Sequence, residues 1–384
     1  MTNNDHTTAS SSRSHRSSRF DRFDKSGTRA WRTGEAKIAA YIAEWLQQAG
    51  ASVELDEPRP GRVSVIARVP GTGGGRSLLL NGHIDTVGVT GMKNAHAPRV
   101  EGDKLFGRGS YDMKSGVAAA MLTLASAAHL RLRGDVILTA VCDEEHASIG
   151  TESALKRVSA DAAIVTEPTA LGIAIAHKGF AWFTVETSGV AAHGSRPDLG
   201  VDAILAMGKV LNGLERLNQI LAQGPRHPLL GPASIHASLI SGGQELSSYP
   251  EQCRLSVERR TIPGESLTKI QDEIKSILDQ ESRLNSRFKG TFTTGLVREP
   301  LEVPKTEPIV TTLLKTAASQ LKREPGFQGF SGWTDAALIA AAGIPTVIFG
   351  PGGAGAHAVD EWCNLREVLT CCEILVATAA TFCA

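Results

Sequence analysis

The chain has 384 residues, of which 42% are hydrophobic and only 5% aromatic, and its 40 Lys and Arg balance 40 Asp and Glu. This length predicts two or three domains with buried cores. The zero net charge argues against a polyanion-binding surface, so we expect no nucleic acid partner. No apolar run approaches the ~20 residues that cross a bilayer, so we expect no membrane partner either.

The first segment, residues 1–30, is rich in Ser and Arg and contains few apolar side chains. We expect it to be disordered, because it cannot bury enough surface to offset its ordering entropy. It also lacks the apolar stretch of a secretory signal. The six cysteines form no Cys-x-x-Cys pair and are interpreted as reduced side chains. Together these features predict a cytoplasmic protein.

From residue 31 onward the sequence has the pattern of a globular protein. Apolar positions at helical spacing predict a first helix over residues 38–46. Short apolar runs predict buried strands at 77–80, 136–141, 162–165 and 346–349, and an Ala-rich stretch predicts a helix at 115–130. Buried strands that alternate with helices indicate an α/β fold with a mostly parallel sheet covered on both faces.

Residues 179–295 have a different pattern of polar and apolar residues. Alternating polar and apolar positions predict strands at 181–187, 234–240, 252–260 and 290–296, with amphipathic helices at 201–217 and 265–281. The order β-α-β-β-α-β is that of a compact, ferredoxin-like α/β sandwich. We therefore expect this unit to be inserted into a first domain formed by residues 31–178 and 296–384.

Polar side chains follow four of the predicted strands, and one more precedes the Ala-rich helix. They are His83 and Asp85, Glu144 and Glu145, Glu167, His357, and Asp112. Because ligands of open parallel sheets gather at the carboxyl ends of the strands, these five segments are expected to converge on one edge.

Imidazole and carboxylate groups in this number suit a pair of divalent metal ions that share one bridging carboxylate. Each fragment alone has a more ordinary explanation. A single His after a strand is usually a satisfied polar residue, Asp112 could be a helix N-cap, and Glu144-Glu145 could belong to a solvated loop. The occurrence of all of them at predicted strand ends, in order, favours a metal site.

These motifs also carry a resemblance. They are GHIDTV at 82–87, GRGSYDMKSG at 107–116, DEE at 143–145, TEPT at 166–169 and GPGGAGAHAVDEW at 350–362. The sequence from residue 31 to its end resembles the co-catalytic zinc hydrolases of the M20 class, which include acetylornithine deacetylase, succinyl-diaminopimelate desuccinylase, aminoacylase and glutamate carboxypeptidase. The resemblance implies two divalent metal ions per chain, zinc in the first place, with cobalt or manganese as alternatives.

The resemblance also implies a role for each residue of the cluster. His83 and Glu167 would hold one metal, Glu145 and His357 the other, and Asp112 would bridge the two. Asp85 would orient the His83 ring by accepting its second N–H. Glu144 would be the general base, which takes a proton from water and later gives one to the leaving amine.

Further roles follow from the inserted unit and from one glycine-rich loop. GVAAHGSRPDLGVDAI at 189–204 resembles a lid and dimerisation motif, in which His193 would reach the active site of a second subunit in a homodimer. ERRTIPGES at 258–266 resembles the segment whose Arg grips the substrate carboxylate. We assign this role to Arg260, which lies three residues before Pro263. Strand alternation sends Arg259 and Arg260 to opposite faces, so only one of them should point at the site. Backbone N–H groups of Gly352 and Gly353 are expected to help hold that carboxylate.

The expected function is metal-dependent hydrolysis of the amide bond of an N-acyl amino acid, as in acetylornithine deacetylase. A dipeptidase or carboxypeptidase of the same class is the alternative, and a non-catalytic metal-binding protein that keeps the fold is a remote one. Two departures from the family pattern bear on this expectation. The Ser- and Arg-rich start replaces the usual first helix, and residues 246–251 lack the Asn commonly found there, which leaves the substrate open.

Overall fold

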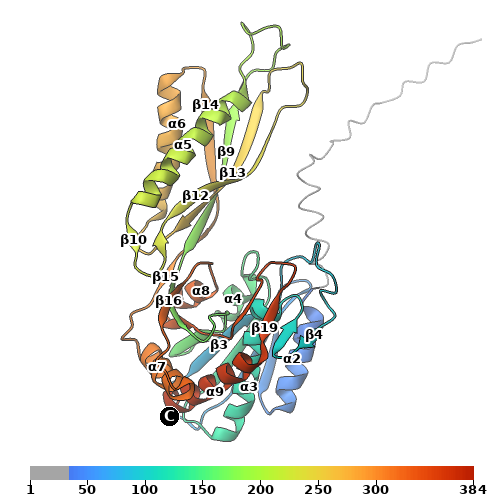
Figure 1. The fold of residues 1–384 in the computed structure, drawn as a ribbon, viewed down its shortest axis with the longest axis vertical. Coiled ribbons are helices and arrows are strands. Elements are labelled where there is room, and N and C mark those ends of the chain that lie inside the picture. The colour runs from blue at the N-terminus through green and yellow to red at the C-terminus, as the bar shows by residue number, and fades with distance from the viewer. Residues whose placement is uncertain (1–33) are drawn as a thin grey trace, which may run out of the picture.

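The computed structural model describes residues 34–384, so the disorder expected for residues 1–30 concerns residues outside the described part. Figure 1 shows two parts stacked along the long axis of the molecule. The lower part comprises residues 34–178 and 299–384, and the upper part comprises residues 179–298. Each part has its own sheet and its own hydrophobic core.

The lower part is built on a nine-stranded sheet of order β1-β2-β6-β3-β7-β17-β8-β15, with β16 beside β8. The strands are β1 (Ser52–Arg59), β2 (Arg62–Val69), β3 (Leu78–His83), β6 (Val136–Val141), β7 (Ala162–Val165), β8 (Ile173–His177), β15 (Leu301–Glu302), β16 (Phe327–Phe330) and β17 (Thr346–Ile348). The central strands β6, β3, β7 and β17 are parallel, as expected. Antiparallel neighbours flank them on both sides, so the sheet as a whole is mixed.

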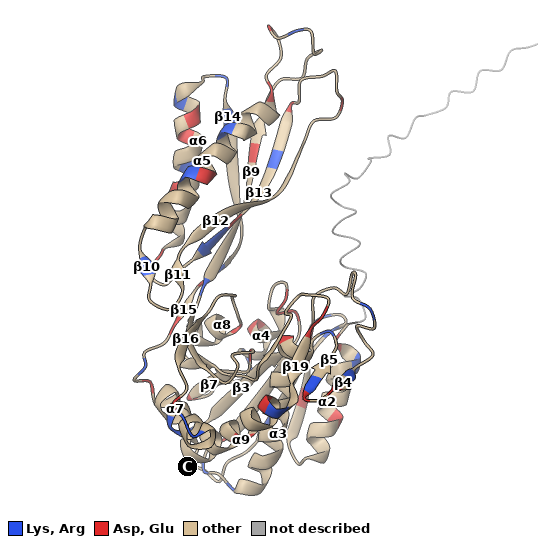
Figure 2. Ribbon diagram, viewed as in Figure 1, with Lys and Arg blue, Asp and Glu red and all other residues tan. Residues whose placement is uncertain are grey.

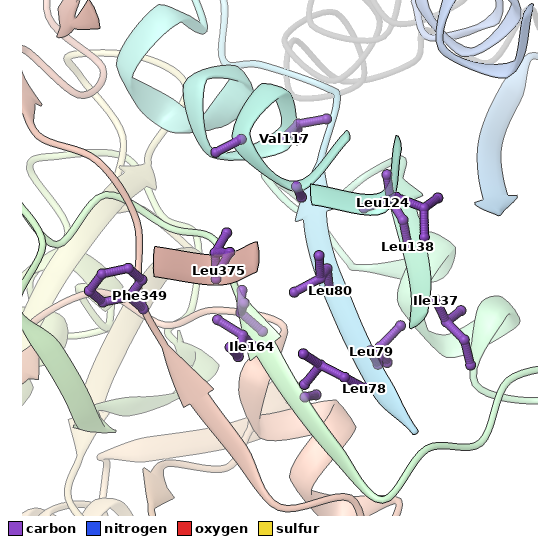
Figure 3. Close-up of a cluster of buried hydrophobic side chains, with 14 of the residues drawn as sticks. Leu78, Leu79, Leu80, Val117, Leu124, Ile137, Leu138, Ile164, Phe349 and Leu375 are labelled. Carbon is purple, nitrogen blue, oxygen red and sulfur yellow. The ribbon is translucent and has the colours of Figure 1, made fainter. Parts of the chain in front are cut away.

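Helices cover both faces of this sheet. One layer contains α2 (Ala36–Gln48), α3 (Ser115–Leu130), α7 (Pro308–Leu321) and α9 (Leu365–Phe382), and the other contains α4 (Ile149–Ala154) and α8 (Ala336–Ala341). Because both faces are covered, β3 and β6 are buried along their whole length. Figure 3 shows Leu80 of β3 and Leu138 of β6 in the core near Leu124 of α3 and Leu375 of α9.

The upper part has a four-stranded antiparallel sheet of order β12-β13-β9-β14. Its elements in chain order are β9 (Gly179–Ser188), α5 (Ala203–Gln223), β12 (Ser234–Gly242), β13 (Gln252–Thr261), α6 (Leu267–Leu284) and β14 (Lys289–Arg298). The short pair β10 (Arg226–His227) and β11 (Gly231–Pro232) lies between α5 and β12. Helices α5 and α6 pack on one face of the sheet, which accounts for the alternating burial along β13.

A small sheet of order β18-β19-β5-β4 borders the lower part. Its strands are β4 (Arg99–Glu101), β5 (Lys104–Phe106), β18 (Gly353–Ala354) and β19 (Trp362–Asn364). A short helical turn at Ser110–Lys114 leads from this sheet into α3. The sheet therefore brings residues near 110 together with residues near 360, which are far apart in the sequence.

The chain crosses between the two parts twice, and both crossings are short. Lys178 alone separates β8 from β9, and Glu299 and Pro300 separate β14 from β15. Lys and Arg positions and Asp and Glu positions are interspersed along the ribbon of both parts in Figure 2. Within residues 34–384, no helix combines the length and the apolar character that a membrane span requires.

Candidate metal centre and substrate cavity

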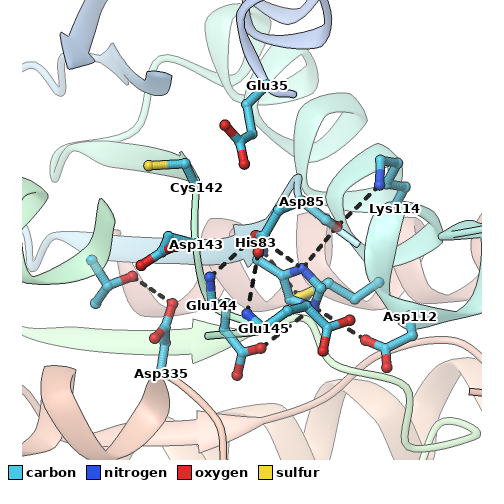
Figure 4. Close-up of polar contacts among 12 residues, drawn as sticks. Glu35, His83, Asp85, Asp112, Lys114, Cys142, Asp143, Glu144, Glu145 and Asp335 are labelled. Carbon is cyan, nitrogen blue, oxygen red and sulfur yellow. Dashed lines mark hydrogen bonds and ion pairs between the residues drawn. The ribbon is translucent and has the colours of Figure 1, made fainter. Parts of the chain in front are cut away.

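Five segments converge at the carboxyl ends of the central strands. This edge of the sheet faces the upper part (Figure 1). His83 is the last residue of β3, and Glu144 and Glu145 follow β6. Glu167 follows β7, Asp112 lies in the turn before α3, and His357 lies in the loop between β18 and β19. Figure 4 shows His83, Asp112, Glu144 and Glu145 directed toward one another.

Asp112 lies between the two imidazole rings. Its Oδ1 is 3.1 Å from His83 Nε2, and its Oδ2 is 3.3 Å from His357 Nε2. His357 Nε2 is also 3.0 Å from Glu145 Oε2. His83 Nε2 lies 3.9 Å from Glu144 Oε2 and 3.8 Å from Glu167 Oε1. The two oxygens of Asp112 thus serve two separate groups of side chains.

The electrostatics of the cluster follow from packing several carboxylates out of water. Burial raises the pKa of Glu144 and of Glu167 well above the usual range, and the neighbouring acids raise both further. Burial opposes protonation of His83, but hydrogen bonds to Asp112 and Asp85 raise its pKa well above normal. Hydrogen bonds to Asp112 and Glu145 raise the pKa of His357 to about 10.

This arrangement fits divalent metal ions. Two sets of three side chains could each hold a metal ion, because the ligand atoms within each set lie within 4.8 Å of one another. One set is His83, Glu144 and Glu167, and the other is His83, Asp112 and Glu145. Buried carboxylates carry a large desolvation cost unless cations compensate them, and imidazole with carboxylate is a donor set that zinc and related ions accept. Glu144 belongs to one of these sets, so its position fits both a metal ligand and a general base.

Asp85 connects the histidine to the acidic loop. Its Oδ1 lies 3.5 Å from His83 Nδ1, and its two oxygens accept the backbone N–H groups of Glu144 and Glu145 at 3.2 Å each. Although burial favours the neutral acid, the bonds to His83 and the Glu145 N–H lower the pKa of Asp85. The backbone carbonyl of Asp85 also lies 3.2 Å from His83 Nδ1. Asp85 therefore holds the His83 ring and the backbone of the Glu144-Glu145 turn in fixed relation.

Glu361 is a site residue that sequence reasoning missed. Its fully buried carboxylate accepts the backbone N–H groups of Gly109, Tyr111 and Asp112 at 3.0, 2.9 and 3.1 Å, and it pairs with Arg108 at 2.6 Å. Glu361 thereby fixes the turn that presents Asp112. The only signal was its place in the motif GPGGAGAHAVDEW, four residues after His357.

Arg62 forms a second buried network behind the cluster. Its guanidinium pairs with Glu35 at 2.8 Å and with Asp143 at 2.9 Å, and lies 3.9 Å from Asp85. Glu35 precedes α2, and Asp143 immediately precedes Glu144. The network thus ties the start of α2 to the acidic loop after β6. These residues also were not anticipated, because their contacts join segments with no common motif.

A cavity of about 370 Å³ opens in front of the cluster, and its lining comes from both parts of the molecule. Asp112, Glu144, Glu145, Glu167 and His357 line the lower side. Arg260 of β13 lines the upper side, whereas Arg259 is buried on the helix-covered face, where it pairs with Glu265 at 2.6 Å and Glu273 at 3.1 Å. Arg260 is thus the one of the two arginines that faces the cluster.

Gly352 and Gly353 are not brought into this cavity. Gly353 pairs with Cys363 in the β18–β19 ladder, and a Cβ on it would approach the Trp362 carbonyl to 2.2 Å. A Cβ on Gly352 would approach Glu367 to 2.4 Å. Close packing against the Trp362 backbone therefore accounts for Gly353, and packing against the Glu367 side chain for Gly352. The cavity is lined from this loop by Ala356 and His357 instead.

His193 also lies away from the cluster within this chain. It belongs to the segment between β9 and α5, which is at the end of the upper part farthest from the lower sheet (Figure 1). Its ring is exposed, and Nδ1 is 2.8 Å from Ser195 Oγ. The residues that line the cavity do not include His193.

Comparisons with known proteins agree with this geometry. Residues 79–381 match the family described as Peptidase family M20/M25/M40. The chain is 30% identical over 360 residues to an acetylornithine deacetylase of Myxococcus xanthus, covering 89% of this chain and 91% of that protein. It is 29% identical over 382 residues to the N-formyl-4-amino-5-aminomethyl-2-methylpyrimidine deformylase of Bacillus subtilis (strain 168), covering 90% and 89% of the two chains.

The fold is also that of solved structures. The YXEP protein of Bacillus subtilis, described as a dinuclear metal binding peptidase from the M20 family, superposes with a TM-score of 0.70 at 15% identity. The match covers 94% of this chain and 98% of that protein.

Proposed function

The chain belongs to peptidase family M20/M25/M40 and is an amidohydrolase or metallopeptidase, and we propose that within this family it hydrolyses N-acyl amino acids. The bond cleaved would be of the kind that acetylornithine deacetylase cleaves, the name borne by a relative that is 30% identical over most of both chains. The products would be a carboxylic acid and a free amino acid.

One observation supports this proposal above the others. A single cavity places the buried carboxylate of Glu144, beside the cluster of ligand-type side chains, opposite the guanidinium of Arg260. A substrate that spans the cavity would present an amide to the cluster and a carboxylate to Arg260, whose planar fork pairs with carboxylates through two hydrogen bonds. An N-acyl amino acid has this arrangement of groups.

Two divalent ions, most simply zinc, with cobalt or manganese as alternatives, would polarise the amide carbonyl and lower the pKa of the attacking water. His83 and Glu167 would hold one ion, Glu145 and His357 the other, with Asp112 between them, as the two-sided contacts of Asp112 support. Asp85 would keep the His83 ring and the Glu144-Glu145 turn in place.

The protein's own residues would then move the proton. Glu144 would accept a proton from water as the water attacks the carbonyl carbon, and would donate it to the leaving amine nitrogen. Burial raises the pKa of Glu144 in the metal-free protein, and two bound cations would lower it again, toward the range in which one carboxyl can act as a base and then as an acid.

We further propose that the inserted unit, expected over residues 179–295 and ending with β14 at residue 298 in the structure, acts as a lid and dimerisation domain on a catalytic domain formed by the lower part. The distal position of His193 in its own chain supports a role in the site of a second copy, where it would steady the oxyanion that develops on the carbonyl oxygen.

A dipeptidase or carboxypeptidase activity would use the same groups. To decide, we would load the protein with Zn²⁺ or Co²⁺ and assay N-acetyl-ornithine, other N-acetyl amino acids, N-succinyl-diaminopimelate and dipeptides, with and without a chelator. Chelator-sensitive release of amino acid from the N-acetyl compounds would support the proposal. Cleavage of dipeptides alone would favour the alternative. Metal-loaded, folded protein that turns over no compound would favour a non-catalytic protein.

A further inference from the structure

Four aromatic side chains line the cavity. Although aromatic residues are only 5% of the chain, Phe180, Trp182, Phe330 and Trp333 all line it, and they include two of the five tryptophans. We call these four residues the aromatic wall. Phe180 and Trp182 come from β9 in the upper part, and Phe330 and Trp333 lie at the end of β16 and before α8 in the lower part.

Three rings of the aromatic wall form a continuous row. The centroid of Phe180 lies 5.2 Å from that of Trp182 and 6.0 Å from that of Trp333. Phe180 is almost buried between them, whereas Trp182 is 38% exposed. Both indole N–H groups already have acceptors, since Trp182 donates to Glu258 at 2.8 Å and Trp333 to the Glu299 carbonyl at 3.1 Å. The row therefore offers ring surface to a ligand rather than hydrogen-bond donors.

The charged groups beside the aromatic wall are paired. Arg260 pairs with Glu258 at 2.6 Å, and Arg298 pairs with Glu152 at 3.0 Å. The guanidinium groups also lie over the rings, Arg260 at 5.4 Å from the Phe180 centroid and Arg298 at 5.5 Å from that of Trp333. A ligand ammonium here would find both nearby carboxylates, Glu258 and Glu152, already paired with arginines. An uncharged flat group needs no carboxylate partner.

The register of the upper sheet places the aromatic wall beside the carboxylate-binding arginine. Phe180 pairs directly with Arg260 across β9 and β13, and Trp182 pairs with Glu258. Directly opposed residues have Cβ atoms about 5 Å apart. In an amino acid, the side chain and the carboxylate branch from the same carbon. A substrate whose carboxylate binds Arg260 therefore places its side chain within reach of the rings.

We propose that the aromatic wall selects N-acyl amino acids whose side chain is an uncharged aromatic ring, in preference to aliphatic or cationic side chains such as that of ornithine. This inference rests on the proposed function, since it assumes that Arg260 binds the carboxylate. It adds the chemical class of the side chain, which the metal cluster itself does not determine.

The first test compares kcat/KM of the Zn²⁺-loaded enzyme on N-acetyl-phenylalanine, N-acetyl-tryptophan, N-acetyl-leucine, N-acetyl-alanine and N-acetyl-ornithine. We expect the aromatic substrates to exceed leucine and ornithine by about tenfold, the scale of one ring-on-ring contact together with its buried area. Efficient turnover with ornithine or leucine equal to or above phenylalanine would overturn the inference and leave the proposed function intact.

The second test changes the aromatic wall. Trp182→Leu and Trp333→Leu should each raise KM for N-acetyl-phenylalanine by about tenfold while changing kcat and the N-acetyl-alanine values less than about threefold. Trp45→Leu is the matched control, because Trp45 is a half-buried tryptophan of α2 outside the cavity. Trp182→Phe should restore most of the affinity. An equal loss with phenylalanine and alanine substrates would show that the rings have only a structural role.

A binding measurement separates this inference from the proposed function. Calorimetry would compare the free amino acids phenylalanine, leucine and ornithine as product-like ligands of the Zn²⁺-loaded protein. Tighter binding of phenylalanine, lost in Trp182→Leu, would support the aromatic wall even if no N-acetyl compound were hydrolysed, in which case only the proposed function would fail. Equal binding of all three would refute the inference directly.

Discussion

The carboxylate of Glu361 accepts the backbone N–H of Asp112 at 3.1 Å, although 249 positions separate the two residues in the sequence. The same oxygen also accepts the Tyr111 N–H, and the other oxygen binds Gly109 and Arg108. The side chain that stands between the two histidines is therefore held by the far end of the chain. A change at Glu361 should therefore reach the metal centre through the backbone of Asp112.

Glu361→Gln should weaken metal binding, because an amide cannot accept from three N–H groups and a guanidinium with both of its terminal atoms. We expect a loss of about 10- to 100-fold in Zn²⁺ affinity, the usual effect of altering a group that orients a ligand. Competition with a chromophoric chelator would measure it. Glu101→Gln, on exposed β4, is the control. A lower melting temperature with unchanged metal affinity would show that Glu361 serves stability alone.

Glu144→Gln should lower kcat by about 10²- to 10⁴-fold and leave the metal content unchanged, if Glu144 transfers the proton. Glu145→Gln should instead reduce the metal content, because it removes a carboxylate that would bind the ion. Atomic absorption and steady-state kinetics on both variants would separate a base from a ligand. A rate above a tenth of the wild-type value in Glu144→Gln, or loss of metal from it, would contradict the assignment.

His193→Ala should lower kcat more than it changes KM, because His193 would act on the charge that develops during reaction. Mixing His193→Ala with Glu144→Ala should then recover activity. In randomly reassembled dimers, about half would be mixed, each with one intact site, which gives about a quarter of the wild-type rate. Size-exclusion chromatography with light scattering would establish the dimer first. Reassembled dimers with no recovered activity would mean that each chain works alone.

The pH dependence of stability should include a contribution from His177. Burial lowers its pKa from 6.5 to about 4, and its Nδ1–H donates to the Lys178 carbonyl at 2.9 Å. The unfolded chain therefore binds the proton first as the pH falls. The stabilisation is complete above about pH 6.5 and is lost toward pH 4, by up to about 3.5 kcal/mol at ~1.4 kcal/mol per pKa unit.

His177→Gln would keep a donor but would not titrate. In metal-free protein, the free energy of unfolding in urea should fall less between pH 7 and pH 4.5 for His177→Gln than for the wild type. The other acids titrate equally in both proteins, so the difference isolates His177. Identical pH slopes would contradict this prediction.

The parts of the fold that could be predicted are those that local pattern determines. The apolar runs at 136–141 and 162–165 correspond exactly to β6 and β7, and the Ala-rich stretch to α3. Buried strands covered on both faces have no alternation that could be confused with a loop. The antiparallel edge strands were not predicted, because β1 is largely exposed and polar and β15 is only two residues long.

The residues of the candidate site also fall into those that local sequence pattern could place and those that it could not. Side chains that directly follow buried strands, such as His83 and Glu167, could be placed at one sheet edge from topology alone. Glu361 and Arg62 could not, because each acts through contacts with segments distant in the sequence. Nor could the packing that excludes Gly352 and Gly353 from the cavity, since β18 and β19 are too short to leave a pattern.

The two short crossings between the parts have a mechanical consequence. If the upper part rotated about Lys178 and the Glu299-Pro300 step, Phe180 would lie close to the axis of rotation and His193 far from it. Since β9 has ten residues, the strand extends about 33 Å beyond Lys178. A rotation that displaces His193 by several ångströms would barely shift the rings around Arg260. A bound aromatic ring would therefore remain in place while the far end of the upper part moved toward or away from a neighbouring molecule.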